Sequence, residues 1–285
     1  MQEKRHYKIS VAGCGNLAYR ISIALKISGH TIDYIYGRDI AEAEKLSYIL
    51  NKPETTGVSI TSEDCKLSSH SPTKATDRLN DLAISEVVIL AISDSAINGF
   101  SDSFFNSIKD VDYLPVVLHS SGATQADVLN KWPSYGVLYP LMTLSKTKPV
   151  DFKLIPFFLE ASNPQVLEIM TNICYTLGSE YKVCSSEERL RVHTAAVFIS
   201  NFVNYLTGLA FDISGQNQMF LMPLAIETVR KAFLYEHPSL VQTGPAVRDD
   251  HETMKKHLQM LSNMEDHKLV YETISRLILK QKNSR

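Results

Sequence analysis

A glycine turn near the N-terminus carries the residues with the clearest chemistry. From position 8 the chain reads KISVAGCGNLA, an apolar run that leads into Gly13-x-Gly15-x-x-Ala18 and then into apolar residues at helical spacing. Gly13 permits a tight turn, Gly15 lets a phosphate approach the backbone, and Ala18 lets the helix pack closely on the strand. Free N–H groups at the helix start favour an anion. The turn therefore predicts a dinucleotide site, in preference to a turn without a ligand, held by Gly13, Cys14, Gly15, Asn16 and Leu17.

The end of the second predicted strand indicates which dinucleotide is bound. Thr31–Tyr36 reads as this strand, and Gly37 and Arg38 follow it. A site that prefers NAD usually has Asp or Glu at this point to hold the ribose 2′-hydroxyl. An arginine suits a 2′-phosphate instead, through its charge and bidentate geometry. We therefore predict NADP; the alternative leaves Arg38 on the surface, with Asp33 or Asp39 as the ribose partner.

A long helix predicted to begin at Ser186 supplies a second group of polar residues. Residues at spacings of three, four, seven, eight and eleven share one face of it: His193, Ala196, Val197, Ser200, Asn201 and Asn204. Because histidine titrates near neutral pH, His193 could donate the proton that accompanies a hydride, while Asn201 and Ser200 orient a substrate. The alternative is that these groups form hydrogen bonds between helices, within the chain or across a subunit interface.

A turn near the C-terminus offers a cationic group. Thr243-Gly244-Pro245 precedes a predicted helix, with Asp249 as its expected N-cap. Arg248 could clamp a substrate carboxylate. Alternatively, Arg248 forms a structural ion pair with Asp249 or Asp250.

The elements that must position these residues follow an alternating pattern. Glu86–Ile92 and Val116–His119 are continuous apolar runs, as expected for parallel strands covered on both faces. Tyr135–Leu141 and Ile155–Leu159 read as further strands, and Val58–Ile60 is a candidate for a short one. Strands that alternate with helices predict an α/β fold, a doubly wound parallel sheet of the Rossmann type.

Ligands of such sheets bind beyond the carboxyl ends of the strands. The glycine turn and Arg38 fall there, and so do the residues that follow two of the apolar runs. We therefore add Ser93, Asp94, His119 and Ser120 to the predicted cofactor site. Asp94 or Ser95 is the expected N-cap of the next helix.

From Ser186 onward the pattern is helical only. We expect a nucleotide-binding domain over 1–185 and a helical domain over 186–285. Further helices are expected at Met222–Tyr235, Asp249–Ser262 and Asp266–Lys280. The most apolar stretch, Ala195–Ile213, carries too many polar residues for a membrane span, so we expect a buried helix there.

Composition excludes several classes of protein. The net charge of −2, with no run of basic residues, argues against nucleic-acid binding. Cys14, Cys65, Cys174 and Cys184 show no metal-binding spacing, and the histidines and carboxylates form no local metal motif, so we expect no metal, reduced thiols and a cytoplasmic location. The N-terminus has no apolar core typical of a signal peptide.

Several short motifs occur in a fixed order along the chain. They are His119-Ser120-Ser121-Gly122, Tyr139-Pro140-Leu141, Ile155-Pro156-Phe157-Phe158, Arg191-x-His193 followed by Ser200-Asn201, Pro223-Leu224, and Thr243-Gly244-Pro245 with Arg248-x-Asp250. This set resembles a bacterial group of Rossmann-like proteins whose C-terminal domain has no assigned function. The wider resemblance is to pyrroline-5-carboxylate reductases, β-hydroxyacid dehydrogenases and deazaflavin-dependent NADP oxidoreductases, whose helical domain is like that of 6-phosphogluconate dehydrogenase.

The resemblance implies NADP-linked reduction of a carbonyl or imine, in a dimer whose helical domains pack together, with the site in the cleft between the domains. Three departures accompany it. The chain lacks the Lys-x-x-x-Asn pair of β-hydroxyacid dehydrogenases, because Val197 stands four residues after His193. The Gly-Gly-Thr-Thr-like loop of pyrroline-carboxylate reductases is absent, and Tyr139 stands where the closer group has histidine.

The prediction is thus an NADP(H)-dependent oxidoreductase acting on a small, acidic metabolite as a homodimer. His193 would donate the proton, Asn201 and Ser200 would orient the substrate, and Arg248 would bind its carboxylate. Two alternatives stay open at this point. One is a non-catalytic NADP-binding sensor or partner subunit, and the other is a Rossmann domain that binds a different adenine-containing ligand.

Overall fold

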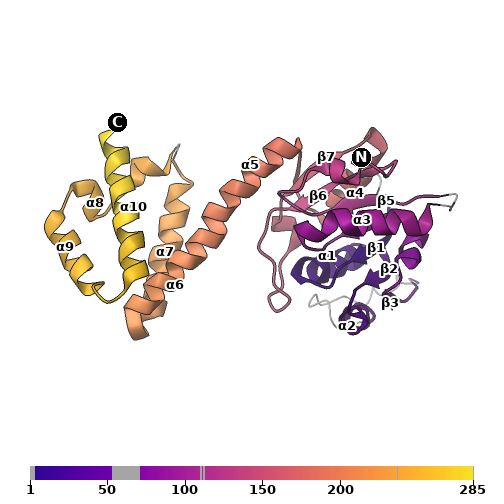
Figure 1. The fold of residues 1–285 in the computed structure, drawn as a ribbon, viewed down its shortest axis with the longest axis horizontal. Helices are drawn as coiled ribbons and strands as arrows, with labels where there is room; N and C mark the ends of the chain where they lie inside the picture. The colour runs from indigo at the N-terminus through magenta and orange to yellow at the C-terminus, as the bar shows by residue number, and fades with distance from the viewer. Residues whose placement is uncertain (1–3, 53–70, 110, 112, 236, 285) are drawn as a thin grey trace. The chain divides into compact units, whose positions relative to one another are not determined.

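The computed structural model describes residues 4–52, 71–109, 111, 113–235 and 237–284 (Figure 1). The expected strand at Val58–Ile60 and the side chain of Cys65 lie outside these residues. The chain divides into two compact units, Met1–Ser200 and Asn201–Arg285, which we call the nucleotide unit and the helical unit.

The nucleotide unit is built on an eight-stranded sheet with the order β3-β2-β1-β4-β5-β6-β7-β8. Its strands are β1 (Lys8–Ala12), β2 (Thr31–Tyr36), β3 (Lys74–Thr76), β4 (Val87–Leu90), β5 (Val116–His119), β6 (Tyr135–Pro140), β7 (Phe157–Ala161) and β8 (Tyr181–Val183). Ala12 pairs with both Tyr36 and Leu90, and Leu90 pairs with His119. The carboxyl ends of four neighbouring strands are therefore level with one another at one edge of the sheet.

The sheet is mostly parallel, as predicted, with one exception. β7 runs antiparallel to β6, so the expectation of a wholly parallel sheet is wrong at this strand. The cause is the connection between them, which holds one short 3-10 helix and no crossover helix. A strand that begins at the edge where its predecessor ended must run back in the opposite direction.

Helices cover both faces of the sheet. They are α1 (Asn16–Ile27), α2 (Ile40–Leu50), α3 (Asp94–Ile108) and α4 (Pro164–Leu177). Along β4, Val87 and Ile89 belong to one buried cluster, which includes residues of α1, α2 and α4. Val88 and Leu90 belong to a second cluster, which includes residues of α3. This alternation explains why β4 is apolar at every position, since each face packs against helices.

Local sequence determines where several helices begin and end. The side chain of Asn163 caps α4, Pro164 opens it, and Gly178 ends it with a φ of +70°. Ser93 is the N-cap residue of α3 and Asp94 lies in its first turn, so the expected cap at Asp94 or Ser95 is wrong by one or two residues.

The helical part of the chain begins at Ser186, as predicted. It contains α5 (Ser186–Val197), a π-helical segment (Phe198–Phe202), α6 (Val203–Ser214), α7 (Gln218–Ala232), α8 (Pro245–Arg248), α9 (His251–Met260) and α10 (Glu265–Asn283). Short 3-10 helices occupy Leu79–Ile84, Ala126–Leu129, Phe152–Leu154, Gly215–Asn217 and Pro238–Val241. Asp249 adopts a φ of +58° and Asp250 caps α9 through Thr253, so the expectation of Asp249 as the cap is wrong.

The expected buried helix at Ala195–Ile213 is also wrong. Its large apolar side chains are exposed, Phe198 by 63% and Tyr205 by 54%. In the helical unit, Ala246 and Leu261 are the described hydrophobic residues that are buried. The longer run Ser186–Ala232 meets the length and composition of a membrane-crossing helix. The prediction failed because apolar character was equated with burial inside the same chain.

Candidate active site

The glycine turn has the geometry that its sequence predicts. Gly13 lies at the end of β1 with a φ of +123°, a conformation that side-chain-bearing residues rarely adopt. A Cβ at this position would lie 2.3 Å from the carbonyl oxygen of Ala91. The Gly13 N–H donates to the carbonyl of Tyr36, with the two atoms 2.8 Å apart. The turn is therefore held against β2 and against the residue that follows β4.

The start of α1 fits a diphosphate. A Cβ added at Gly15 would meet none of the described atoms within 4 Å. α1 begins without a side-chain cap and without an acidic residue in its first turn. The space beside Gly15 is thus open among the described residues, and the first N–H groups of α1 carry the positive end of the helix dipole. Asn16 and Leu17 form this turn, and Leu17 packs on the core.

The thiol of Cys14 lies inside the turn and is half-buried. Burial raises its pKa, so the thiol is neutral at physiological pH. A neutral thiol at this position adds no negative charge beside a phosphate site.

Arg38 follows β2 and is exposed. The two carboxylates considered as alternative ribose partners are engaged elsewhere. Asp33 accepts a hydrogen bond from Ser85 Oγ at 2.7 Å, and Asp39 caps α2 through the N–H of Ala41. Arg38 is thus left at the end of β2 without a hydrogen bond or ion pair to a residue that the structure describes.

The segment after β5 is held by its own side chains. The buried His119 ring accepts from the Ser121 N–H at Nδ1 and lies 3.2 Å from the Gln125 carbonyl at Nε2, which assigns the ring proton to Nε2. Burial lowers the pKa of His119 to about 4, so the ring is neutral. Ser120 Oγ donates to the Leu90 carbonyl. The His119 and Ser120 side chains therefore hold the loop through hydrogen bonds to the backbone. The cofactor contacts predicted for His119, Ser120, Ser93 and Asp94 stay predictions.

His193 is paired with Tyr139 at the carboxyl edge of the sheet. Tyr139 Oη lies 3.0 Å from His193 Nδ1, and the two rings meet edge to face. A Cβ at Gly122 would lie 2.5 Å from His193 Nδ1, so only glycine permits this approach of the β5 loop. Burial and the Asp94 carboxylate raise the pKa of Tyr139, which keeps the phenol protonated. The sequence had left Tyr139 without a role, because nothing local links it to a helix 54 residues away.

Arg189 is the residue of this site that sequence reasoning missed. It is fully buried, and its guanidinium pairs with Glu160 of β7 and donates to the carbonyl of Thr124 at 2.6 Å and to Ser186 Oγ at 3.1 Å. These bonds join α5 to β7 and to the loop after β5. Since Arg189 and His193 are one turn apart on α5, the brace also positions His193. In the sequence, the four-residue spacing of Arg189 and His193 was the pattern that could have indicated this role.

A π-helical segment interrupts the long helix at two of the predicted substrate residues. Ser200 and Asn201 lie within Phe198–Phe202, where a π turn adds residues to the helical period. A π turn has more residues per turn than an α turn, and the placement of His193, Asn201 and Asn204 on one face stays a prediction. Ser200 Oγ donates to the Ala196 carbonyl at 2.7 Å. Asn201 belongs to the helical unit, whereas His193 belongs to the nucleotide unit.

Arg248 is exposed at the end of α8. The structural ion pair considered as its alternative role is not formed among the described residues. Asp249 faces His251 at 3.3 Å, and Asp250 accepts from the backbone and side chain of Thr253. The guanidinium is therefore available to a ligand.

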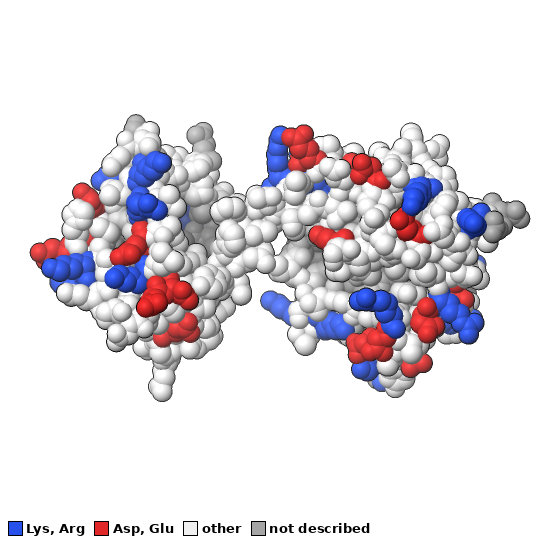
Figure 2. Space-filling model, in the orientation of Figure 1, with Lys and Arg blue, Asp and Glu red and all other residues white. Residues whose placement is uncertain are grey.

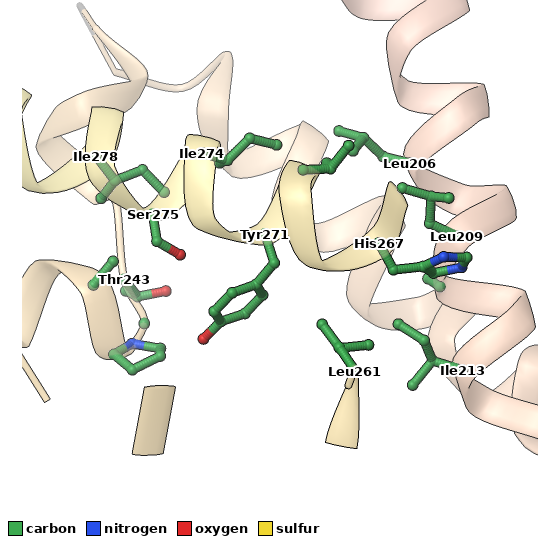
Figure 3. A pocket seen from close by; sticks show the side chains of 15 residues that line it. Leu206, Leu209, Ile213, Thr243, Leu261, His267, Tyr271, Ile274, Ser275 and Ile278 are labelled. Carbon is green, nitrogen blue, oxygen red and sulfur yellow. The ribbon is translucent and has the colours of Figure 1, made fainter. Parts of the chain in front are cut away.

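A cavity of about 350 Å³ lies within the helical unit, between α6, α8 and α10 (Figure 3). Its lining is mainly aliphatic, with Leu206, Leu209 and Ile274 among its walls. Two polar side chains of the lining already have hydrogen-bond partners: His267 pairs with Asp212, and Tyr271 pairs with His257. Arg248 is not part of the lining, so this cavity does not have the charge that an acidic metabolite requires.

Comparisons with known proteins identify the family. Residues 155–278 match a family described as a domain of unknown function, DUF2520. The structure of BF3122 from Bacteroides fragilis, classed provisionally as an NADP oxidoreductase, is 30% identical to this chain, with coverage of 96% of this chain and 98% of that one and a TM-score of 0.80. This chain belongs to that Rossmann-like family with a C-terminal DUF2520 domain.

More distant structures share the fold of the DUF2520 protein. A Bacillus cereus imine reductase has a TM-score of 0.57 at 12% identity, with coverage of 97% of this chain and 93% of that one. A Coxiella burnetii pyrroline-5-carboxylate reductase has a TM-score of 0.53 at 13% identity, with coverage of 96% and 99%. A search of curated proteins gives no match. The predicted Rossmann sheet with a C-terminal helical domain is confirmed.

Metal-binding clusters and disulfides are not found in the described part of this DUF2520 protein. No group of three or more His, Cys, Asp or Glu side chains is placed there to hold a metal ion. Cys14, Cys174 and Cys184 are free thiols.

Proposed function

We propose that this protein is an NADP(H)-dependent oxidoreductase that transfers a hydride between nicotinamide and the C=O or C=N carbon of a small, acidic metabolite. The observation that carries the proposal is the Tyr139–His193 pair, which lies at the same edge of the sheet as the glycine turn. A proton donor at the ligand edge of a Rossmann sheet is what carbonyl or imine reduction requires.

The nucleotide unit supplies the groups that hold the cofactor. The N–H groups at Gly15 and Asn16 would receive the diphosphate, and the Arg38 guanidinium would receive the 2′-phosphate. When bound, the nicotinamide supplies or accepts the hydride. The preference for NADP over NAD rests on Arg38, because a cation at the strand end gains only from a phosphorylated ribose.

His193 would donate the proton to the substrate. With Tyr139 donating to Nδ1, the ring proton lies at Nε2, where it can be given to the oxygen or nitrogen that gains the hydride. As Nε2 loses its proton, Nδ1 can take the proton of the Tyr139 phenol, and the phenolate that results takes a proton from solvent before the next turnover. Arg189 would keep α5 in place, so that the donor is held in one orientation.

The substrate contacts come from the residues predicted for them. Ser200 and Asn201 in the π-helical segment would orient the substrate through hydrogen bonds, and Arg248 would bind its carboxylate bidentately. π segments often occur at functional sites. We propose a small-molecule substrate and no nucleic-acid partner, because basic and acidic side chains are interspersed on the face of each unit in view in Figure 2.

We further propose a cytoplasmic homodimer that forms through the helical unit. α6 and α7 expose large apolar side chains, including Phe211, Met219, Phe220 and Leu224. We favour a second copy over a membrane as their cover because Asn201, Asn204 and Asp212 interrupt the run, and such residues are costly in lipid. Free thiols suit a reducing compartment.

Thermal-shift titration with NADP, NADPH, NAD and S-adenosylmethionine tests the cofactor. A ligand at a hundred times its dissociation constant adds about 2.7 kcal/mol of stability to the unit that binds it. We expect stabilisation by NADP and NADPH at lower concentrations than by NAD. Stabilisation by S-adenosylmethionine alone, or by none of the four, would contradict the proposal.

The His193→Asn variant tests the chemistry. Loss of a general acid costs about 10²–10⁴-fold in turnover, while the Kd for NADP should stay unchanged. The control is His251→Asn, which alters an exposed histidine of α9 and should leave both quantities as they are. Wild-type protein that binds NADP but turns over no carbonyl or imine would be a sensor or partner subunit instead.

A further inference from the structure

The loop that follows β6 is tied to the start of α1. Arg20 donates through Nε to the carbonyl of Ser145 at 2.7 Å and through Nη2 to the carbonyl of Lys146 at 2.9 Å. The side chain of Asn16 accepts from the N–H of Lys146 at 3.2 Å. Three hydrogen bonds across more than 120 residues of sequence thus place the backbone of Lys146 beside the turn that would bind the diphosphate.

The side chain of Lys146 extends from there to the first turn of α2. Its Nζ lies 3.4 Å from Oε2 of Glu42. The ammonium also counteracts the effect of burial on the pKa of Cys14, so its charge acts on the glycine turn. The Cys14 sulfur in turn lies 2.9 Å from where a Cβ of Gly37 would be, in the turn between β2 and α2. Lys146 therefore lies between the glycine turn and the segment that carries Arg38.

We infer that Lys146 is a second cation for the 2′-phosphate of NADP and contributes with Arg38 to the choice of NADP over NAD. This inference rests on the proposed function, because it assigns a specificity residue to the same cofactor site. The guanidinium of Arg38 follows β2 directly, whereas the ammonium of Lys146 comes from the loop after β6, 104 residues beyond its partner Glu42. A phosphate offers three acceptor oxygens, enough for a planar fork and a point charge together.

The present partner of Lys146 allows this role. The pair with Glu42 is open to solvent, with side-chain exposures of 41% and 38%, and exposed ion pairs are weak. Lys45 also binds Glu42, at 2.6 Å. When Lys146 turns to a phosphate, Lys45 still neutralises Glu42, so the carboxylate does not face the phosphate uncompensated.

Binding constants of single variants test the inference. We would titrate the full-length protein with NADP and with NAD by calorimetry at one fixed ionic strength. Lys146→Ala should weaken NADP binding about tenfold, the effect of one lost hydrogen bond to a charged group, and change NAD binding less than about twofold. Lys146→Arg should retain NADP binding. The same comparison can be made with adenosine 2′,5′-bisphosphate and 5′-AMP, which differ in the 2′-phosphate and carry no nicotinamide.

Lys148→Ala is the matched control. Lys148 is an exposed lysine of the same loop, so its loss changes the net charge equally. We expect less than about a twofold effect on either dinucleotide, because Lys148 has no hydrogen bond or ion pair with a described residue of α2 or of the glycine turn, and a solvated charge is screened by salt. Equal loss of NADP and NAD binding in Lys146→Ala, or no loss of either, would overturn the inference while the proposed function stands. Wild-type protein that binds neither dinucleotide would overturn both.

Discussion

The two units of this protein bury their apolar residues to very different extents. In the nucleotide unit, buried clusters lie on both faces of the sheet, and β4 and β5 are buried at every position. In the helical unit, Ala246 and Leu261 are the buried hydrophobic residues among those described. The nucleotide unit therefore has its own core, whereas the helical unit leaves most of its large apolar side chains exposed in the single chain.

The difference also separates two kinds of site. Residues of the nucleotide unit are held by buried partners, as His119 and Arg189 are. Arg248 in the helical unit is exposed and has no hydrogen bond or ion pair with a side chain that the structure describes. Four experiments can break or sharpen this contrast. Trp132, the single tryptophan, reports on the nucleotide unit because it lies in the core of that unit.

The largest effect is expected at Arg189. Arg189→Met leaves Glu160 without its partner and removes the bonds to Thr124 and Ser186. Breaking a buried ion pair costs about 3–5 kcal/mol. Urea unfolding followed by Trp132 fluorescence measures it. Arg191→Met, two residues along α5 and exposed, is the control, with an expected change below about 0.5 kcal/mol. Similar losses in both variants would show that the nucleotide unit does not depend on the brace.

A pair of glycines gives the next contrast. Gly13→Ala forces a side chain into a φ of +123° and against the Ala91 carbonyl, so we expect a loss of about 3 kcal/mol and of dinucleotide binding. Gly208→Ala in α6 meets no described atom within 4 Å and should stabilise its helix by up to about 1 kcal/mol. Thermal unfolding followed by Trp132 fluorescence and by circular dichroism separates the two. A large loss at Gly208 would show that this position is covered in the assembled protein.

The pH dependence of stability should come from the nucleotide unit. Burial lowers the pKa of His30 and of His119 from 6.5 to about 4. The unfolded chain binds more protons than the native unit in this window, so the stability contributed by the neutral rings is present above pH 6.5 and is lost as the pH falls towards 4. The loss should approach about 3 kcal/mol per histidine.

Urea unfolding of the wild type and of His119→Gln at pH 7.5, 5.5 and 4.5 checks this expectation. The variant should lose less stability between the first and last pH than the wild type does. Parallel curves for the two proteins would mean that His119 is not the group that titrates.

The smallest effect is expected in the helical unit. Phe220 of α7 is 81% exposed in the single chain, and Phe220→Asp should weaken the proposed dimer by about 1–2 kcal/mol without changing the Trp132 transition at low protein concentration. Light scattering over a dilution series measures the dimer. Leu154→Asp, at an exposed leucine of the nucleotide unit, is the control. A wild-type protein that is monomeric at all concentrations would contradict the proposed assembly.

Local patterns were sufficient for most elements of the fold. Gly13, Gly15 and Ala18 predicted the turn, the start of α1 and its packing, because each depends on residues a few positions apart. The onset of the helical part at Ser186 was predicted because the cap residue, Ser185, is adjacent to it in sequence. The direction of β7 was not predicted, because it depends on how a loop returns to the sheet.

The sequence by itself determined the Rossmann sheet, the onset of the helical part at Ser186 and His193 as a candidate proton donor, since hydrophobic period, turn glycines and residue chemistry are local properties. Tertiary structure alone decided that Tyr139 pairs with His193, that Arg189 braces α5, and that Lys146 lies beside the glycine turn. Those contacts join residues up to 130 positions apart. The energy of these contacts depends on how the fold brings strands and loops together. The spacing of residues along the chain does not show which distant residues will meet.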